Sequence, residues 1–70
     1  MISPGDSVYY GGDSMGARAN RRDVGTVGAA RADGMMPVRW QHSPSDGWWV
    51  RADGVGRHSE GFTFWVWHSP

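Results

Sequence analysis

Three histidines are the side chains in this sequence best suited to bind a metal or to transfer a proton. His42, His58 and His68 lie far apart, and no two of them have the His-x-His or i,i+4 spacing that holds ligand geometry on a strand or helix. We therefore expect ordinary surface histidines and no metal site. Ser43 and Asp46 next to His42 could form a hydrolytic triad on paper, but serine and aspartate are common here and we expect no catalytic residues.

Other kinds of catalysis are also disfavoured by composition and length. Glu60 is the one glutamate, so a paired-carboxylate site would depend on aspartates in loops. The chain has no lysine, which excludes the lysine of a phosphate-binding loop. A chain of 70 residues buries only about 60% of its unfolded surface, which leaves little room for both a core and a deep pocket. We predict a protein that is not an enzyme and needs no cofactor.

Arginine and aromatic side chains are the remaining candidates for binding. Both types are enriched at the hot spots of protein interfaces, and both contact nucleic acid. The predicted partner-binding residues are the aromatic and arginine side chains that alternation places outside: Tyr9, Arg39, Trp49, Arg51, Trp65 and Trp67. A second set, in the long loop from Gly11 to Asp23, could contact nucleic acid: Arg18, Arg21 and Arg22. The formal charge of zero excludes a strongly basic binder and favours a protein partner.

Five short apolar segments must position these side chains, at residues 7–10, 24–30, 36–41, 48–52 and 62–67. Turn-forming pairs separate several of them, at Asp33-Gly34, Asp46-Gly47 and Asp53-Gly54, and such pairs between apolar runs indicate hairpins. The chain has no leucine but is rich in valine, tryptophan and glycine, which favours strands over helices. The sequence predicts one all-β domain over residues 1–70, a five-stranded antiparallel barrel with a long first loop.

Period-two alternation divides the predicted strands into an inner and an outer face. The predicted core is Val8, Tyr10, Val27, Ala29, Val38, Trp40, Val50, Phe64 and Val66, with Trp48 on the same side as Val50. Residues 62–67 form an uncharged, strongly β-prone run, which would promote aggregation if one edge stayed free. We expect both barrel closure and a partner to cover this run. The string Arg-Ala-Asp-Gly occurs at 31–34 and at 51–54, which we interpret as one turn chemistry used twice rather than as a structural repeat.

No apolar run approaches the roughly 18 residues of a membrane span, and the first residues have no signal-peptide character. We expect a cytoplasmic or virion protein. Arginine in place of lysine, together with abundant alanine, glycine and valine, is typical of a GC-rich genome such as that of an actinobacterium or its phage.

Three motifs in order carry a family resemblance: Gly5-Asp6-x-Val8, then Gly25-Thr26-Val27, then Val38-x-Trp40. This layout resembles the SH3-like barrels of the KOW, Tudor and Mib/Herc2 type. The segment from Asp33 to Trp40 is also similar to a short actinobacterial domain family of unknown function. The resemblance implies a small barrel that acts as a binding module, and such barrels serve many functions.

The sequence thus leaves two functions open. The first is protein–protein contact, with another protein or with copies of itself, including a structural role in a phage capsid or tail. The alternative is a nucleic-acid-associated regulatory module of the KOW/Tudor kind. Balanced charge favours the first, because affinity for a polyanion depends on many uncompensated cations.

Overall fold

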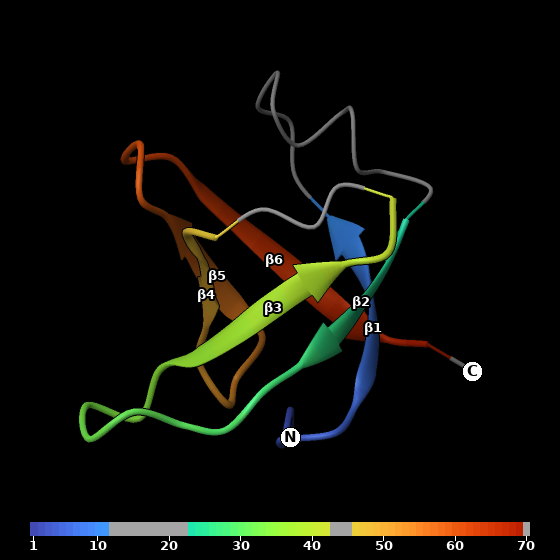
Figure 1. The fold of residues 1–70 in the computed structure, drawn as a ribbon, viewed down its shortest axis with the longest axis horizontal. Coiled ribbons are helices and arrows are strands. Elements are labelled where there is room, and N and C mark those ends of the chain that lie inside the picture. Colours follow the sequence, from blue (N-terminus) through green and yellow to red (C-terminus); the bar gives the residue numbers. More distant parts are fainter. Residues whose placement is uncertain (12–22, 43–45, 70) are drawn as a thin grey trace.

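The computed structural model describes residues 1–11, 23–42 and 46–69, and within them the chain forms six strands (Figure 1). These are β1 (Ser7–Gly11), β2 (Val24–Val27), β3 (Met36–Trp40), β4 (Trp48–Val50), β5 (Val55–His58) and β6 (Thr63–His68). Each strand pairs antiparallel with the next one in sequence, and β6 pairs with β1 to close a barrel. The all-β antiparallel barrel is confirmed, but the predicted number of five strands is wrong.

The missed strand is β5, which lies in a stretch that looks polar in the sequence. Its inward positions are Gly56 and His58, neither of which gives an apolar alternation signal. Gly56 faces Phe64 across the β5–β6 register, and a Cβ atom at this position would overlap the Phe64 ring. The aromatic ring of the neighbouring strand therefore supplies the apolar volume that β5 itself lacks.

Three hairpins share one turn geometry, and this geometry fixes where the strands reverse. At Arg31, Arg51 and His58 the backbone N–H donates to the carbonyl four residues later, at 2.8, 2.8 and 2.9 Å. The fourth residue of each turn is a glycine with positive φ, at +85° for Gly34 and +90° for Gly54. A type I turn followed by such a glycine is a standard three-residue hairpin loop. The hairpins predicted at Asp33-Gly34 and Asp53-Gly54 are confirmed.

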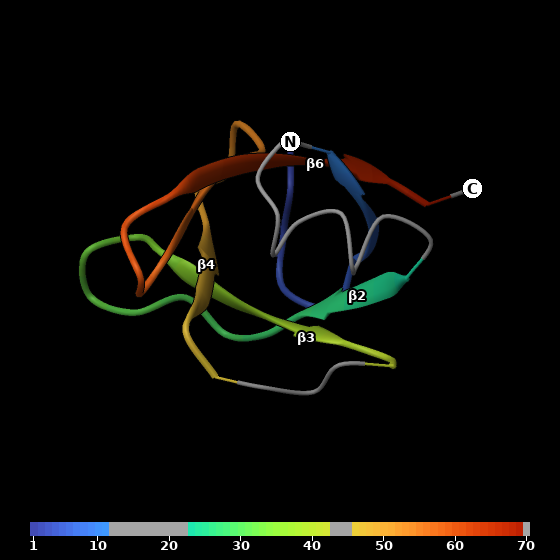
Figure 2. The ribbon, with the colours of Figure 1, turned by 90° about the horizontal axis from the view of Figure 1, so that it is seen from above.

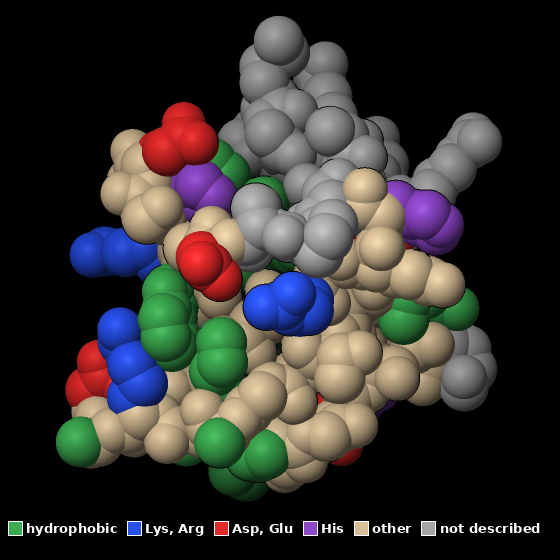
Figure 3. All heavy atoms as spheres, in the orientation of Figure 1, with side chains coloured by type: hydrophobic (Ala, Val, Ile, Leu, Met, Phe, Trp, Pro, Cys, Tyr) green, Lys and Arg blue, Asp and Glu red, His purple; other side chains and the backbone are tan. Residues whose placement is uncertain are grey.

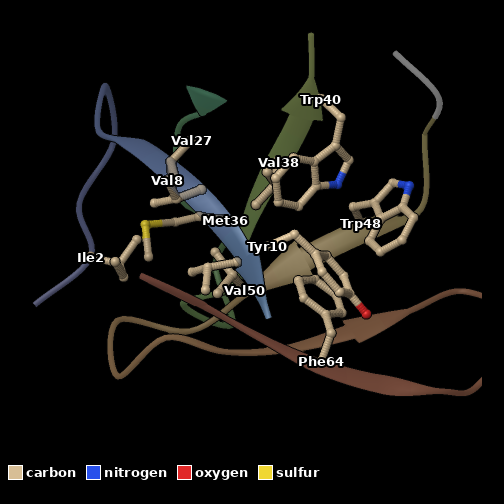
Figure 4. Close-up of a cluster of buried hydrophobic side chains, with 11 residues drawn as sticks. Ile2, Val8, Tyr10, Val27, Met36, Val38, Trp40, Trp48, Val50 and Phe64 are labelled. Atoms are coloured by element: carbon tan, nitrogen blue, oxygen red, sulfur yellow. The ribbon is translucent and has the colours of Figure 1, made fainter. Parts of the chain in front are cut away.

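The barrel interior is filled mainly by aromatic rings and valines (Figure 4). Its buried apolar side chains are Ile2, Val8, Tyr10, Val27, Met36, Val38, Trp40, Trp48, Val50, Phe64 and Val66. Tyr10 stacks on Phe64 with ring centroids 5.7 Å apart, and Trp48 meets Phe64 edge-on at 5.1 Å. The Nε1 atom of Trp40 is the one buried side-chain nitrogen or oxygen in the described residues without a hydrogen-bond partner, and it points toward Trp48 in Figure 4. Large rings thus occupy the space that leucine would otherwise fill.

One predicted core residue is wrong, and two buried apolar residues were not predicted. Ala29 is exposed, because β2 ends at Val27 and alternation no longer applies once the chain leaves the ladder. Ile2 and Met36 are buried instead. The Ile2 backbone N–H donates to the Ala52 carbonyl at 2.8 Å, which holds the N-terminal segment against the barrel.

Closure of the barrel resolves the edge problem of β6. Both edges of this strand are paired, with β5 on one side and β1 on the other. Figure 2 shows β6 and β3 on opposite sides of the barrel, with β4 between them. Outward side chains of β6 and β3 therefore lie on different faces of the molecule. Trp65 and Trp67 on β6 are thus separated from Arg39 on β3, although the sequence predicted all three as partner-binding residues.

Candidate binding surfaces

The two Arg-Ala-Asp-Gly turns hold their arginines in the same way. In each turn the carboxylate accepts a side-on pair of hydrogen bonds, with Nη2 to Oδ2 distances of 2.8 Å for Arg31–Asp33 and for Arg51–Asp53. The same carboxylates accept backbone N–H groups two residues later, each at 3.0 Å. The backbone bond is the main cause that lowers the pKa of Asp33 and of Asp53 below the usual value, and the arginine adds to it.

Trp49 lies between arginines on the outer surface of β4. The guanidinium of Arg31 lies 3.7 Å from the Trp49 ring centroid, which is a cation–π contact. Arg57 is directly opposite Trp49 on β5, and Pro37 is opposite it on β3. Figure 3 shows hydrophobic side chains on this face with Lys or Arg side chains on both sides of them. Trp49 is half-buried as a result, and its exposed part is framed by positive charge.

Two hollows flank Trp49. The larger, of about 600 Å³, is here called the arginine hollow, and it is lined by Arg31, Met35, Trp49, Arg51, Val55 and Arg57 among others. The smaller, of about 380 Å³, lies toward β2 and β3 and is lined by Pro37, Arg39, Asp46 and both Trp48 and Trp49 among others. Trp49 thus forms the wall between two concave sites of different charge.

A separate apolar surface covers the outer side of β5, β6 and β1. This aromatic face consists of four exposed side chains, Tyr9 at 39%, Val55 at 41%, Trp65 at 45% and Trp67 at 56%. The β1–β6 register places Tyr9 opposite Trp67, and the β5–β6 register places Val55 opposite Trp65. The two indoles meet edge-on, with centroids 6.3 Å apart and planes at 90°.

Gly11 allows the two indoles to lie against β1. It is opposite Trp65 in the ladder, and a Cβ atom here would collide with both Trp65 and Trp67. A glycine at this position lets the rings cover the backbone instead of standing away from the sheet. The aromatic face is therefore a packed surface, in which each ring has a defined neighbour.

The predicted partner-binding residues divide among three regions. Tyr9, Trp65 and Trp67 come together on the aromatic face, whereas Trp49 and Arg51 line the arginine hollow and Arg39 lines the smaller one. Arg18, Arg21 and Arg22 lie outside the described residues. Sequence reasoning did not select Arg31, Val55 or Arg57; the repeated Arg-Ala-Asp-Gly string was the signal for Arg31, and the missed strand hid the other two.

Two of the three histidines, His42 and His68, are exposed as predicted, and the third is buried. His42 donates its backbone N–H to the buried carboxylate of Asp23 at 2.8 Å, and its Nδ1 is 2.9 Å from the same group. His58 is buried, contrary to the prediction, and stacks on Phe62 with centroids 4.5 Å apart. Within the described part of the chain no three histidine, cysteine, aspartate or glutamate side chains gather as metal ligands would.

Asp6 joins the N-terminal segment to the end of the last strand. Its carboxylate accepts the Ser3 backbone N–H at 2.8 Å and contacts His68 Nε2 at 2.9 Å. The pKa of Asp6 is lowered first by the Ser3 bond and second by His68. The pair lies where β1 and β6 meet, so it helps to hold the closing seam of the barrel.

The prediction of no catalytic residues overlooked one sequence motif. Residues 12–16 are Gly-Asp-Ser-Met-Gly, the Gly-x-Ser-x-Gly spacing of a nucleophile elbow. They lie outside the described residues. That elbow works at a strand-to-helix turn of an α/β sheet, whereas the described strands form an antiparallel barrel.

The described residues define a class, a small closed antiparallel β-barrel with an aromatic face and an arginine hollow. Comparisons with protein-family models, curated protein sequences and solved structures found no significant match. No helix within residues 1–11, 23–42 and 46–69 is long and apolar enough to cross a membrane.

Proposed function

We propose that this barrel is a non-enzymatic binding module that contacts another protein, or further copies of itself, through the aromatic face. The supporting observation is the exposure of Tyr9, Val55, Trp65 and Trp67 on one side of a 70-residue chain. Together these side chains leave roughly 400 Å² of largely apolar surface in contact with water. The largest apolar patch on a monomeric protein is typically about 300 to 600 Å² and is often functional.

The chemistry of the face suits a protein partner. Tryptophan and tyrosine are enriched among the residues that dominate binding energies. Because β1 and β6 are paired on both sides, a partner cannot add a strand to this surface, and recognition must come from side chains. The contact of the two indoles over Gly11 restricts their motion before binding, which lowers the entropic cost of association.

Kinship with the SH3-like barrels of the KOW and Tudor type remains part of this proposal, as does assembly into a phage particle. The nucleic-acid alternative has less support. Arg31 and Arg51 are already paired with aspartates, and one face of the Trp49 ring is occupied by Arg31. A base would have to displace that guanidinium to stack there.

The experiment compares the aromatic face with a matched position on the opposite side of the barrel. A photoreactive phenylalanine derivative replaces Tyr9 in one version of the chain and Arg39 in another, and each is irradiated in the organism that carries the gene. The proposal expects a discrete cross-linked protein, or a cross-linked dimer, from position 9 and none from position 39. The Trp65→Ser, Trp67→Ser double variant should lose the adduct while its circular dichroism spectrum is retained.

Sedimentation velocity over a wide range of protein concentration separates self-association from a foreign partner. Self-association should grow with concentration in the native chain and disappear in the double variant. The proposal fails if position 9 gives no discrete adduct and the native chain stays monomeric, or if the adduct survives loss of both tryptophans.

A further inference from the structure

The arginine hollow offers a second kind of recognition, on the β4–β5 side of the barrel. Its walls combine three guanidinium groups and the carboxylate of Asp33 with the apolar surfaces of Met35, Trp49 and Val55. With a volume of about 600 Å³, it falls within the range of sites that hold a small group or a short peptide segment. It shares only Val55 with the aromatic face, so a ligand here need not compete with a partner bound to the tryptophans.

Two of the three arginines are oriented before any ligand arrives. Asp33 and Asp53 bind the Nε and Nη2 atoms of Arg31 and Arg51, and no described residue accepts a hydrogen bond from either Nη1 atom. Each guanidinium therefore keeps donors in a defined direction while its charge is balanced by its own aspartate. Preorganised donors bind an incoming acceptor at a smaller entropic cost than mobile ones.

Arg57 differs from these two because no described residue forms an ion pair with it. It is opposite Trp49 in the β4–β5 register and lines the same hollow. The hollow thus contains one uncompensated positive charge beside two neutralised arginine–aspartate pairs. Glu60, whose carboxylate is 3.8 Å from Nδ1 of His58 at the end of β5, adds a negative charge nearby. This balance suits a single anionic group and disfavours a polyanion, whose binding depends on many uncompensated cations.

The apolar part of the hollow limits the ligand further. Trp49 is opposite Arg57 in the β4–β5 register, and Val55 lies two residues before Arg57 on the same face of β5, so an anion on Arg57 would have apolar surface beside it. Inorganic phosphate cannot use that surface, whereas an acidic side chain in a peptide has apolar neighbours that can. Planar guanidinium groups also match a carboxylate in geometry, through paired N–H donors.

We propose that the arginine hollow binds an acidic peptide segment of a partner protein. An aspartate or glutamate carboxylate of that segment pairs with Arg57 and accepts from the Nη1 donors of Arg31 and Arg51, while an adjacent apolar side chain packs on Val55 and Met35. This inference goes beyond the proposed function, because it concerns a different face and a ligand of different chemistry.

The test is a titration of the full chain, ¹⁵N-labelled, with two blocked peptides of sequence Gly-Glu-Val-Glu-Gly and Gly-Gln-Val-Gln-Gly. The acidic peptide should give saturable shifts at the amides of residues 55–59 and at the Trp49 indole. Its glutamine counterpart should bind about tenfold more weakly, because it lacks the charge-assisted hydrogen bonds. Arg57→Ala should weaken binding of the acidic peptide by a similar factor. Arg57→Gln serves as a second variant if Arg57→Ala does not fold.

Arg39→Ala is the matched control, because Arg39 is also an exposed strand arginine without an ion-pair partner among the described residues but lines the other hollow. It should leave peptide binding unchanged. The proposal is overturned if the two peptides bind equally, if no saturable shifts occur at residues 55–59, or if Arg39→Ala weakens binding as much as Arg57→Ala. Tighter binding of inorganic phosphate or of oligothymidylate at physiological salt would overturn it in favour of a phosphate site. All variants retain Trp65 and Trp67, so these outcomes are independent of those for the aromatic face.

Discussion

Replacing Gly56 by alanine should destabilise the barrel, although the same change in an unconstrained strand is favourable. The new methyl group would overlap three carbon atoms of the Phe64 ring. Phe64 is only 1% exposed and is held by Tyr10 on one side and by the edge of Trp48 on another, so it has no space into which to move. Overpacking of this kind costs about 1 to 3 kcal/mol.

Part of that cost is offset, because alanine restricts the unfolded chain more than glycine does, by about 0.4 to 1 kcal/mol. The net loss in free energy of unfolding should be about 1 to 2 kcal/mol, which lowers Tm by about 5 to 15 °C in a domain of this size. Urea denaturation followed by far-ultraviolet circular dichroism measures it without depending on tryptophan emission.

Gly11→Ala is the control, since a Cβ atom at Gly11 would also collide with aromatic rings. These rings belong to Trp65 and Trp67, which are about half exposed and can turn into solvent. The free energy of unfolding should then change by less than about 0.5 kcal/mol. Equal stability of Gly56→Ala and the native chain, or an equal loss in the two variants, would refute this explanation of the Gly56–Phe64 contact.

The two Arg-Ala-Asp-Gly turns supply the remaining predictions. Arg31→Ala should lower the free energy of unfolding by about 0.5 to 1 kcal/mol and raise acrylamide quenching of tryptophan emission, because it uncovers Trp49. The matched change Arg51→Ala should not raise quenching. Equal quenching in both variants would contradict the cation–π contact between Arg31 and Trp49. The pKa of Asp53 is lowered from its usual 3.8 by the Val55 N–H first and by Arg51 second, so its stabilisation is present above that value and is lost as the pH falls through the lowered one. The Tm difference between the native chain and Asp53→Asn should therefore stay constant from about pH 7 to pH 5 and shrink below about pH 4, and a constant difference down to pH 2 would refute the assignment.

Local chemistry accounts for what was predicted correctly. The turns at Asp33-Gly34 and Asp53-Gly54 need only a glycine with positive φ and an aspartate that accepts a nearby N–H, and both are encoded within a few residues. Most of the core followed from alternation within single strands, because a strand in a closed barrel has one face inside.

The misplaced residues share a different cause. Ala29 continues an apolar pattern but lies beyond the end of the β2 ladder, and the sequence does not mark where pairing stops. His58 is inward because Phe62 stacks on it from the far side of a turn. Ile2 is buried through its bond to Ala52, which is fifty residues away in the chain. None of these three outcomes follows from apolar alternation within a single strand.

By itself the sequence determined the class of fold, the turns, and an excess of aromatic and arginine side chains on the outside, since these depend on residue type and short-range spacing. Tertiary structure decided how that excess is divided. Barrel closure pairs β6 with β1 and brings Tyr9 beside Trp67, while the strand at 55–58 carries Arg57 to Trp49. One predicted surface became two because register between strands is set by packing around the whole barrel, which no single segment encodes.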